Sequence, residues 1–308
     1  MSGSELRITG YKHCFCSHVC LRNSLPWEGR CGEYRMGWFS FHYSANLLYN
    51  HAMEKEKLTN VDFESIDPYE FKAPYFVCME HLARYIWAAY ILKRKRVKTA
   101  LDIACGPGYG SRELALEGIR TTGFDIDRQN IRTANEKYSV SGLTDYISGD
   151  INAREYLALA GGGPFDAIVC FETLEHVRDP QLFLYDLRRL VRSGGYLVLS
   201  VPEGKYEPLD REGAIKSSYH LHAFSEEQVG QMLGAAGFRV QQRMYQPDSA
   251  GLHRNEFRAI RDTGATRETA ERCYNKSPEA ARYLAQVYAW PRKERGESYS
   301  NIFVSLNE

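Results

Sequence analysis

The sequence predicts an α/β fold in which a mostly parallel, doubly wound sheet is covered by helices on both faces. Short apolar runs of strand length alternate with helical segments between residues 99 and 201, and such βα units form parallel sheets. The stretch Thr99-Ala-Leu-Asp-Ile-Ala-Cys-Gly-Pro-Gly-Tyr-Gly110 begins as a buried strand and ends in three glycines. Glycine allows a tight turn and close approach of the backbone to a ligand, so this stretch indicates a nucleotide-binding turn.

Length and composition limit the class of protein. The chain has 308 residues, 44% of them hydrophobic, which suits one large domain with additions. Lys+Arg and Asp+Glu both total 39, so bulk charge gives no support for a nucleic-acid partner. No apolar run approaches the ~20 residues of a membrane helix, and the N-terminus lacks the apolar core of a signal peptide. Eight cysteines are few for a disulfide scaffold, so we expect a cytoplasmic protein.

Residues 1–65 are predicted to form an N-terminal arm that is rich in cysteine and aromatic residues. A structural zinc ion could be bound there by the thiolates of Cys14, Cys16, Cys20 and Cys31. Their spacing, C-x-C-x3-C-x10-C, lacks the paired knuckles of most zinc sites. The alternative is a set of reduced, partly buried thiols in an irregular arm that packs against the main domain, residues 66–308.

The main domain is predicted to begin with a helix and then to alternate strands and helices. Helices are predicted from apolar spacing at 75–92, 111–118, 130–139 and 180–191. Strands are predicted at 99–104, 121–126, 145–148, 165–171 and 196–201. The Gly-rich breakers at 161–164 and 194–195 separate these elements.

After Pro202 the chain is predicted to be a loop until His222. Ser225-Glu-Glu-Gln228 then predicts a capped helix start, because Ser and Gln three residues apart can satisfy each other's backbone amides. The helix is expected to end at Gly237, with further strands at 238–245 and 299–306. The mostly helical, charged stretch of about 250–295 indicates an insertion over the active face or the arm of a homodimer.

The spacing of the glycines separates three cofactor classes. A Walker loop would need Gly-Lys-Ser/Thr, and the third glycine falls one residue early for the dinucleotide pattern G-x-G-x-x-G. The alternative is S-adenosylmethionine (SAM), which has no pyrophosphate. Asp102 can order the loop amides or take the cofactor ammonium through water, Asp125 can accept both ribose hydroxyls, and Asp150 can accept the adenine amino group.

Several segments together carry a family resemblance: 101–110, 123–127, 149–150, 165–176, 194–200 and 235–238. In this order they resemble the successive motifs of class I SAM-dependent methyltransferases. The resemblance covers about residues 75 to 245 and the last strand, and it implies a seven-stranded sheet whose last strand is antiparallel. It also implies a set of residues lining the cofactor: Asp102, Ala104, Gly106, Gly108, Asp125, Ile126, Asp150, Ile151 and Phe171.

The helix before the glycine turn supplies further candidates. In this family such a helix often meets the methionine carboxylate, and Arg84, near His81, could bind it in a bidentate manner. The alternative for Arg84 is a surface pair with Glu80. Asp127 is expected to cap the helix that follows it rather than to bind the cofactor.

Catalytic groups are expected at the ends of the fourth and fifth strands, where Glu172-Thr-Leu-Glu-His176 lies. In one hypothesis His176, with Glu175 beside it, or a later histidine (His220 or His222) is the general base for a hydroxyl acceptor. In the other, Glu172, Glu175, His176 and His222 bind Mg²⁺ or another divalent ion that lowers the pKa of the hydroxyl. The pattern resembles that of small-RNA 2′-O-methyltransferases and some quinone-pathway O-methyltransferases, but it is also common in this superfamily without a metal.

The predicted function is SAM-dependent O-methylation of a small polar hydroxyl acceptor. A loose similarity of residues 75–90 to methyltransferases near glycan biosynthesis favours a sugar, a glycan precursor or a natural product. One alternative is metal-assisted 2′-O-methylation of RNA, against which the neutral charge argues. Another is a non-catalytic SAM-binding scaffold subunit, against which the intact Asp102, Gly106, Gly108 and Asp125 argue.

Overall fold

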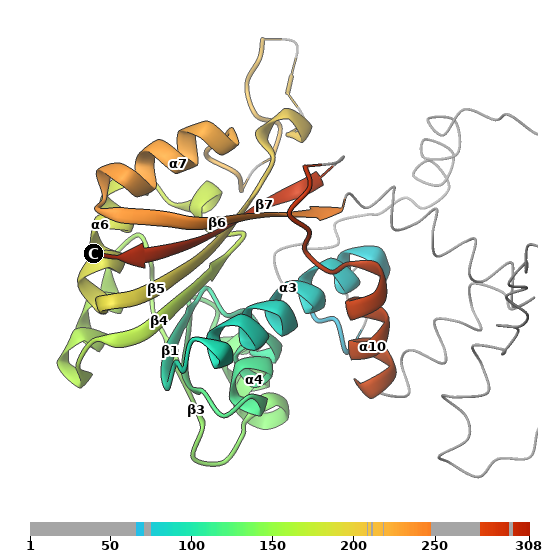
Figure 1. The fold of residues 1–308 in the computed structure, drawn as a ribbon, viewed down its shortest axis with the longest axis vertical. Helices are drawn as coiled ribbons and strands as arrows, with labels where there is room; N and C mark the ends of the chain where they lie inside the picture. Colours follow the sequence, from blue (N-terminus) through green and yellow to red (C-terminus); the bar gives the residue numbers. More distant parts are fainter. Residues whose placement is uncertain are drawn as a thin grey trace, which may run out of the picture.

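The computed structural model describes residues 66–70, 75–207, 209–210, 212–217, 219–247, 278–295 and 298–308. The predicted N-terminal arm and its four cysteines lie outside the described residues. The central feature is a seven-stranded sheet in the order β3-β2-β1-β4-β5-β7-β6 (Figure 1). Its strands are β1 (Thr99–Ile103), β2 (Arg120–Asp125), β3 (Thr144–Ser148), β4 (Phe165–Phe171), β5 (Val191–Pro202), β6 (Phe238–Pro247) and β7 (Ser298–Asn307). The predicted seven-stranded, mostly parallel sheet is confirmed.

The pairing of the strands fixes where a ligand can bind. β1 lies between β2 and β4 and is parallel to both, whereas β7 runs antiparallel to both of its neighbours, β5 and β6. The predicted antiparallel last strand is therefore confirmed. The chain moves outward from β1 to β3 and then crosses back to β4. Ligands of such sheets bind at this switch point, outside the carboxyl ends of the strands.

Helices cover both faces of the sheet. One face packs against α3 (Tyr75–Arg94) and α4 (Tyr109–Leu116), the other against α6 (Pro180–Leu190) and α7 (Glu226–Ala235). Alternate residues of β4 serve the two faces: Val169 lies in the α3 cluster and Ile168 in the α6 cluster. A strand buried on both faces needs apolar residues throughout, which is why the buried part of β4, Ala167–Phe171, is apolar, whereas Asp166 lies at its half-buried start.

The boundaries of the predicted elements agree with the structure to within two residues, with two exceptions, and the 3₁₀ helix η2 (Glu155–Gly162) was not predicted. The helix predicted at 130–139 is α5 (Arg128–Thr133) followed by a π-helical turn, η1 (Ala134–Tyr138). β5 begins at Val191 rather than at 196, because Val191 already pairs with Phe165 across an irregularity in the ladder. The predicted capping box of α7 is present, with Ser225 and Gln228 exchanging hydrogen bonds. Asp127 caps α5 as expected, because its side chain accepts from the Gln129 amide.

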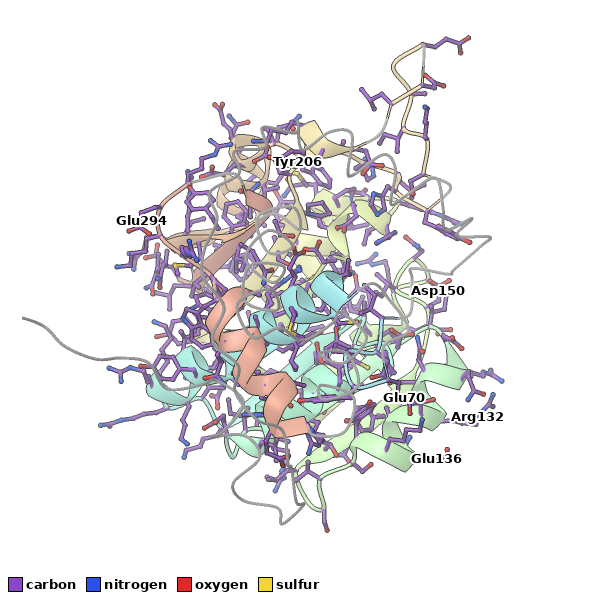
Figure 2. All side chains as sticks on the ribbon, turned by 90° about the vertical axis from the view of Figure 1, so that its right-hand side faces the viewer. Glu70, Arg132, Glu136, Asp150, Tyr206 and Glu294 are labelled. Carbon is purple, nitrogen blue, oxygen red and sulfur yellow. The ribbon has the colours of Figure 1, made fainter. Side chains whose placement is uncertain are left out.

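The late helix α10 (Pro278–Tyr288) packs across α3 (Figures 1 and 2). Its contact is a stripe of alanines, including Ala281 and Ala285, against apolar residues of α3. Arg282 of α10 pairs with the buried carboxylate of Glu113 on α4, which also accepts from the Tyr69 hydroxyl at 2.7 Å. The short segment 66–70 and α10 therefore meet at one buried carboxylate. Residues 250–277 of the predicted helical stretch lie outside the described part.

The surface of the described part is charged. Acidic and basic side chains, among them Glu70, Arg132, Glu136, Asp150 and Glu294, stand out from the ribbon (Figure 2). None of the helices in the described ranges combines the length and the hydropathy of a membrane-crossing segment.

Candidate active site

The glycine turn joins β1 to α4 at the switch point of the sheet. The backbone is left-handed at Ala104, Gly106 and Gly108, with φ values of 60°, 54° and 94°. A Cβ atom at Gly108 would lie 2.5 Å from the Ala134 side chain, so this position needs glycine. A Cβ atom at Gly106 would meet nothing of the described residues within 4 Å, so they leave open space on that side of the turn. The turn is thus closely packed at Gly108 and leaves room for a ligand at Gly106.

Asp102, at the end of β1, holds the two helices beside the turn. Its carboxylate accepts hydrogen bonds from the hydroxyls of Tyr85 on α3 (3.0 Å) and Ser111 on α4 (2.6 Å). Burial raises the pKa of Asp102 to about 7. Gly110 is needed in the same place, because a Cβ atom there would lie 2.3 Å from the Tyr85 ring. Asp102 therefore fixes α3 and α4 to β1 by accepting from a hydroxyl of each helix. Of its two predicted roles, ordering of the loop amides falls to Asp125 at Gly106, and the contact with the cofactor ammonium through water stays a prediction.

Asp125, at the end of β2, orders the glycine turn instead. Its carboxylate accepts from the backbone amide of Gly106 at 2.8 Å and from that of Asp127 at 2.9 Å. Burial raises the pKa of Asp125 above its usual range. The neighbouring Ile126 is exposed, and Asp150 at the end of β3 accepts from the Asn152 amide at 2.7 Å. These residues share one edge of the sheet, and their contacts with ribose and adenine remain predictions.

Arg84 lies beneath the carboxyl ends of β4 and β5. Its side chain is 1% exposed, so the alternative of a surface pair with Glu80 is wrong. Nη1 donates to the Ser200 hydroxyl at 2.8 Å and pairs with Glu172. Nε and Nη2 are buried and have no hydrogen-bond partner within the described part of the chain. Two unpartnered N–H groups of one guanidinium match the two oxygens of a carboxylate.

Glu172 follows β4 in a left-handed conformation with φ 47°. One carboxylate oxygen accepts from the Ser200 hydroxyl at 2.7 Å and the other from the Ser300 hydroxyl at 3.2 Å. Together with the ion pair to Arg84, these contacts engage both oxygens. Glu172 therefore belongs to a buried polar network that joins β5, β7 and α3.

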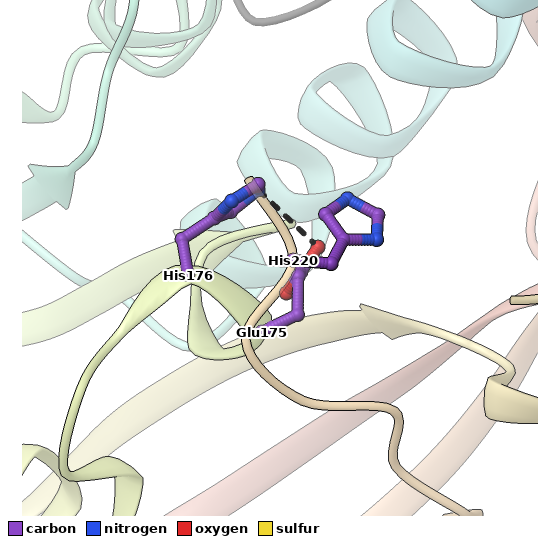
Figure 3. A group of neighbouring side chains, drawn as sticks. All are labelled: Glu175, His176 and His220. Atoms are coloured by element: carbon purple, nitrogen blue, oxygen red, sulfur yellow. Dashed lines mark ion pairs between the residues drawn. The ribbon is translucent and has the colours of Figure 1, made fainter. Parts of the chain in front are cut away.

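Glu175, His176 and His220 gather beside this network, and their side chains point toward one another (Figure 3). One ligand atom from each lies within 4.8 Å of the others. The carboxyl of Glu175 is buried, and neither of its oxygens has a hydrogen-bond partner among the described residues. Burial, followed by the nearby charge of Glu172, raises the pKa of Glu175 well above its usual range. The cluster thus contains a buried acid that the described residues leave unsatisfied.

Each histidine of the cluster is oriented through Nδ1. His176 Nδ1 lies 3.1 Å from the Tyr219 carbonyl oxygen, and His220 Nδ1 lies 2.6 Å from a carboxylate oxygen of Glu207. A carbonyl oxygen only accepts, so His176 carries its proton on Nδ1 and its Nε2 lone pair is free. Burial lowers the pKa of His176, which keeps the ring neutral at pH 7. A neutral imidazole with a bare Nε2 can accept a proton or bind a metal ion.

The predicted catalytic and metal residues are only partly brought together. Glu175 and His176 are neighbours, with His176 Nε2 3.9 Å from a Glu175 oxygen. His222 turns its Nε2 to the Val177 carbonyl at 3.0 Å, and Glu172 is engaged in its own network. His220 takes the third place in the cluster. The predicted metal set included neither His220 nor its partner Glu207, although the two histidines of His220-Leu-His222 were a visible signal in the loop.

Comparison with known families agrees with this arrangement. A family model described as a methyltransferase domain matches residues 77–243, which is more than half of the chain. The chain belongs to this family of class I SAM-dependent methyltransferases. The predicted family is therefore confirmed, and SAM is the cofactor that the family uses.

Curated relatives match a shorter part of the chain. A ubiquinone biosynthesis O-methyltransferase from Pectobacterium atrosepticum is 32% identical over 151 residues, covering 46% of this chain and 61% of that protein. One of the same description from Caulobacter vibrioides is 37% identical over 106 residues, covering 33% and 40%. The matched segments thus span between two fifths and three fifths of these relatives. Among solved structures, magnesium protoporphyrin IX methyltransferase from Synechocystis PCC 6803 is 16% identical, with a TM-score of 0.47, covering 76% of this chain and 86% of that one.

Proposed function

We propose that this protein transfers a methyl group from SAM to a hydroxyl oxygen of a small polar acceptor. The observation that carries the proposal is His176, a neutral imidazole whose Nε2 faces the buried Glu175 at the carboxyl end of β4. The relatives described as O-methyltransferases support transfer to oxygen. Our prediction of a sugar, a glycan precursor or a natural product as the acceptor rests on the sequence alone.

The residues of the glycine-turn edge fit SAM. We propose that the free Nε and Nη2 of Arg84 bind the carboxylate of its methionine portion. The open side of Gly106 leaves space for the ligand, and Asp125 keeps that turn in place through its bond to the Gly106 amide. Ile126 and Asp150 are proposed to contact the nucleoside portion.

The chemistry then requires a proton acceptor. SAM supplies a methyl group on a sulfonium centre and leaves as a neutral thioether, so the chain's residues need only align the acceptor and take its proton. His176 receives the hydroxyl proton at Nε2 while the acceptor oxygen bonds to the methyl carbon. The Tyr219 carbonyl keeps the resulting imidazolium in place by accepting from Nδ1–H.

A transfer assay with radiolabelled SAM and a panel of sugars, phenols and other hydroxyl compounds tests this function. We expect His176→Gln to lower the transfer rate by about 10²–10⁴-fold, the range for general bases. Calorimetry with S-adenosylhomocysteine should give the same affinity for this variant as for the wild type. Unchanged transfer by His176→Gln would exclude its role as the base. Absence of S-adenosylhomocysteine binding to the wild type would exclude the function, and binding without transfer to any acceptor would favour the scaffold alternative.

A divalent ion is a second candidate for activating the hydroxyl. Glu175, His176 and His220 offer donor atoms within 4.8 Å of one another, and both histidines are held through Nδ1 as metal-ligating histidines usually are. We propose this set in place of the predicted one, and the ion would lower the pKa of the acceptor hydroxyl. Elemental analysis should then find about one ion per chain, which Glu175→Gln should remove and His222→Gln should retain. Transfer that is insensitive to a chelator would exclude the metal.

A further inference from the structure

We propose that Glu207 is the positioning residue of the histidine cluster, because its carboxylate holds His220 with the proton on Nδ1 and the lone pair of Nε2 free. This proposal rests on the proposed function only where it concerns the rate of catalysis. The orientation of His220 is a property of the protein alone.

The contact between Glu207 and His220 is short and shielded from water. The carboxylate oxygen lies 2.6 Å from His220 Nδ1, and the Glu207 side chain is only 7% exposed. An ionised carboxylate can only accept a hydrogen bond, so in this contact the proton lies on His220 Nδ1. A buried, charge-assisted bond of this kind is stronger than one between neutral groups.

The backbone around the cluster allows His220 little freedom. The amides of Leu221 and His222 both donate to the carbonyl oxygen of Glu175, at 2.8 and 3.2 Å. The Ser217 hydroxyl accepts from the amide of His220 itself at 3.0 Å. The main chain of His220 is therefore tied to the residue whose carboxyl it faces. What the backbone does not set is which ring nitrogen bears the proton, and Glu207 is placed to decide that.

Which nitrogen of His220 carries the proton decides what the ring can donate or accept. With Nδ1 protonated, both His220 and His176 have a free Nε2, and their rings meet edge to face with centroids 4.8 Å apart. With the opposite tautomer, His220 Nε2 would carry an N–H group in place of its lone pair. The cluster could then neither relay a proton through His220 nor bind an ion with all three donors.

The imidazole tautomer is measured directly by long-range proton–nitrogen NMR on the full chain with ¹⁵N-labelled histidine, with His220→Gln used to assign the signals. We expect wild-type His220 to have a protonated Nδ1 and a bare Nε2. Glu207→Gln should shift the population toward the Nε2–H form that free histidine prefers, because an amide can donate as well as accept. Glu203→Gln is the matched control: Glu203 is similarly buried in the same loop, but its partners are Arg295 and Asn301.

Kinetic measurements, read together with the tautomer result, distinguish a failure of this proposal from a failure of the proposed function. With any acceptor that turns over, Glu207→Gln should lower kcat by about 10–100-fold, the usual effect of losing a partner that orients a functional histidine, and leave the KM for SAM unchanged. A wild-type Nε2–H tautomer, or a tautomer unchanged in Glu207→Gln, would overturn the role of Glu207. If no acceptor turns over, the tautomer result still decides the proposal, whereas the proposed function would fail.

Discussion

Two neighbouring regions at the carboxyl edge of the sheet treat their buried carboxyl groups in opposite ways. On the glycine-turn side, residues 102–127, the acids Asp102 and Asp125 are satisfied by hydroxyls and backbone amides. On the histidine side, residues 172–176 and 203–224, Glu175 is equally buried, yet neither of its oxygens has a partner among the described residues. An unsatisfied buried polar group costs about 1–3 kcal/mol. The first region therefore contributes to the stability of the fold, whereas the second reduces stability in favour of a group that can act on something else.

The largest effect is expected where the glycine-turn side is most tightly packed. Gly110→Ala would place a Cβ atom 2.3 Å from the Tyr85 ring, and overpacking of this kind lowers the free energy of unfolding by about 1–3 kcal/mol. Gly234→Ala in α7 is the control, because a Cβ there meets no atom of the described part of the chain within 4 Å and alanine is the better helix former. We expect this variant to be more stable by up to about 1 kcal/mol. Urea denaturation measures both, and equal shifts would contradict the packing argument.

The contrast itself is tested by one substitution on each side. Asp125→Ala leaves the amides of Gly106 and Asp127 without their acceptor and should cost about 1–3 kcal/mol of unfolding free energy. Glu175→Gln keeps the shape of a side chain whose oxygens make no hydrogen bond within the described part of the chain, so it removes no bond there and should cost less than Asp125→Ala. Thermal and urea unfolding check both. If Glu175→Gln were the more destabilising of the two, the division between the regions would be wrong.

Asp102, on the glycine-turn side, should also make the free energy of unfolding depend on pH. The pKa of Asp102 is about 7 in the folded chain, against an ordinary value of 3.8, because burial disfavours its charged form. The native state therefore binds this proton more tightly than the unfolded state, so the contribution is full below pH 3.8 and is lost as the pH rises through 7. Between pH 5 and 8 we expect the wild type to lose more unfolding free energy than Asp102→Asn, by at most about 1.4 kcal/mol per pH unit. Parallel pH profiles of the two proteins would contradict the shift.

The smallest change in unfolding free energy is expected at two residues with a left-handed backbone, one in each region. Ala104 has φ 60° and Glu172 has φ 47°. Ala104→Gly relieves the backbone and should raise the unfolding free energy by about 0.5–1 kcal/mol. Glu172→Gly relieves the same strain but removes the partner of Arg84, Ser200 and Ser300, so it should destabilise. Calorimetric melting of both variants measures the difference, and two shifts of the same sign would show that the side-chain network is weaker than inferred.

The fold could be predicted because its signals are local. β4 is apolar except for Asp166 and lies between a Gly-Pro breaker and the polar Glu172, and its observed bounds match the prediction. The capping box at Ser225 is likewise contained in four residues. The start of β5 was missed because it depends on pairing with Phe165 in another strand, which overrides the turn signal of Gly194-Gly195.

The candidate site was less predictable because its contacts join distant residues. Arg84 and Glu172 meet only when α3 packs under β4, and nothing in either local sequence indicates the partner. The pair of Glu207 and His220 lies in a loop without periodicity, so spacing could not select His220 over His222. Glu175 and His176 could be predicted as neighbours since they adjoin in sequence.

The close approach of Gly110 to the Tyr85 ring has a consequence for how relatives of this protein can diverge. The two positions lie on different helices, but a side chain at position 110 would need the space that the Tyr85 ring fills. The tyrosine hydroxyl also donates a hydrogen bond to Asp102. A relative that acquires a side chain at the position of Gly110 must also have a smaller residue at the position of Tyr85, and it then loses one donor to the acid. Positions 85, 102 and 110 should therefore covary as a group.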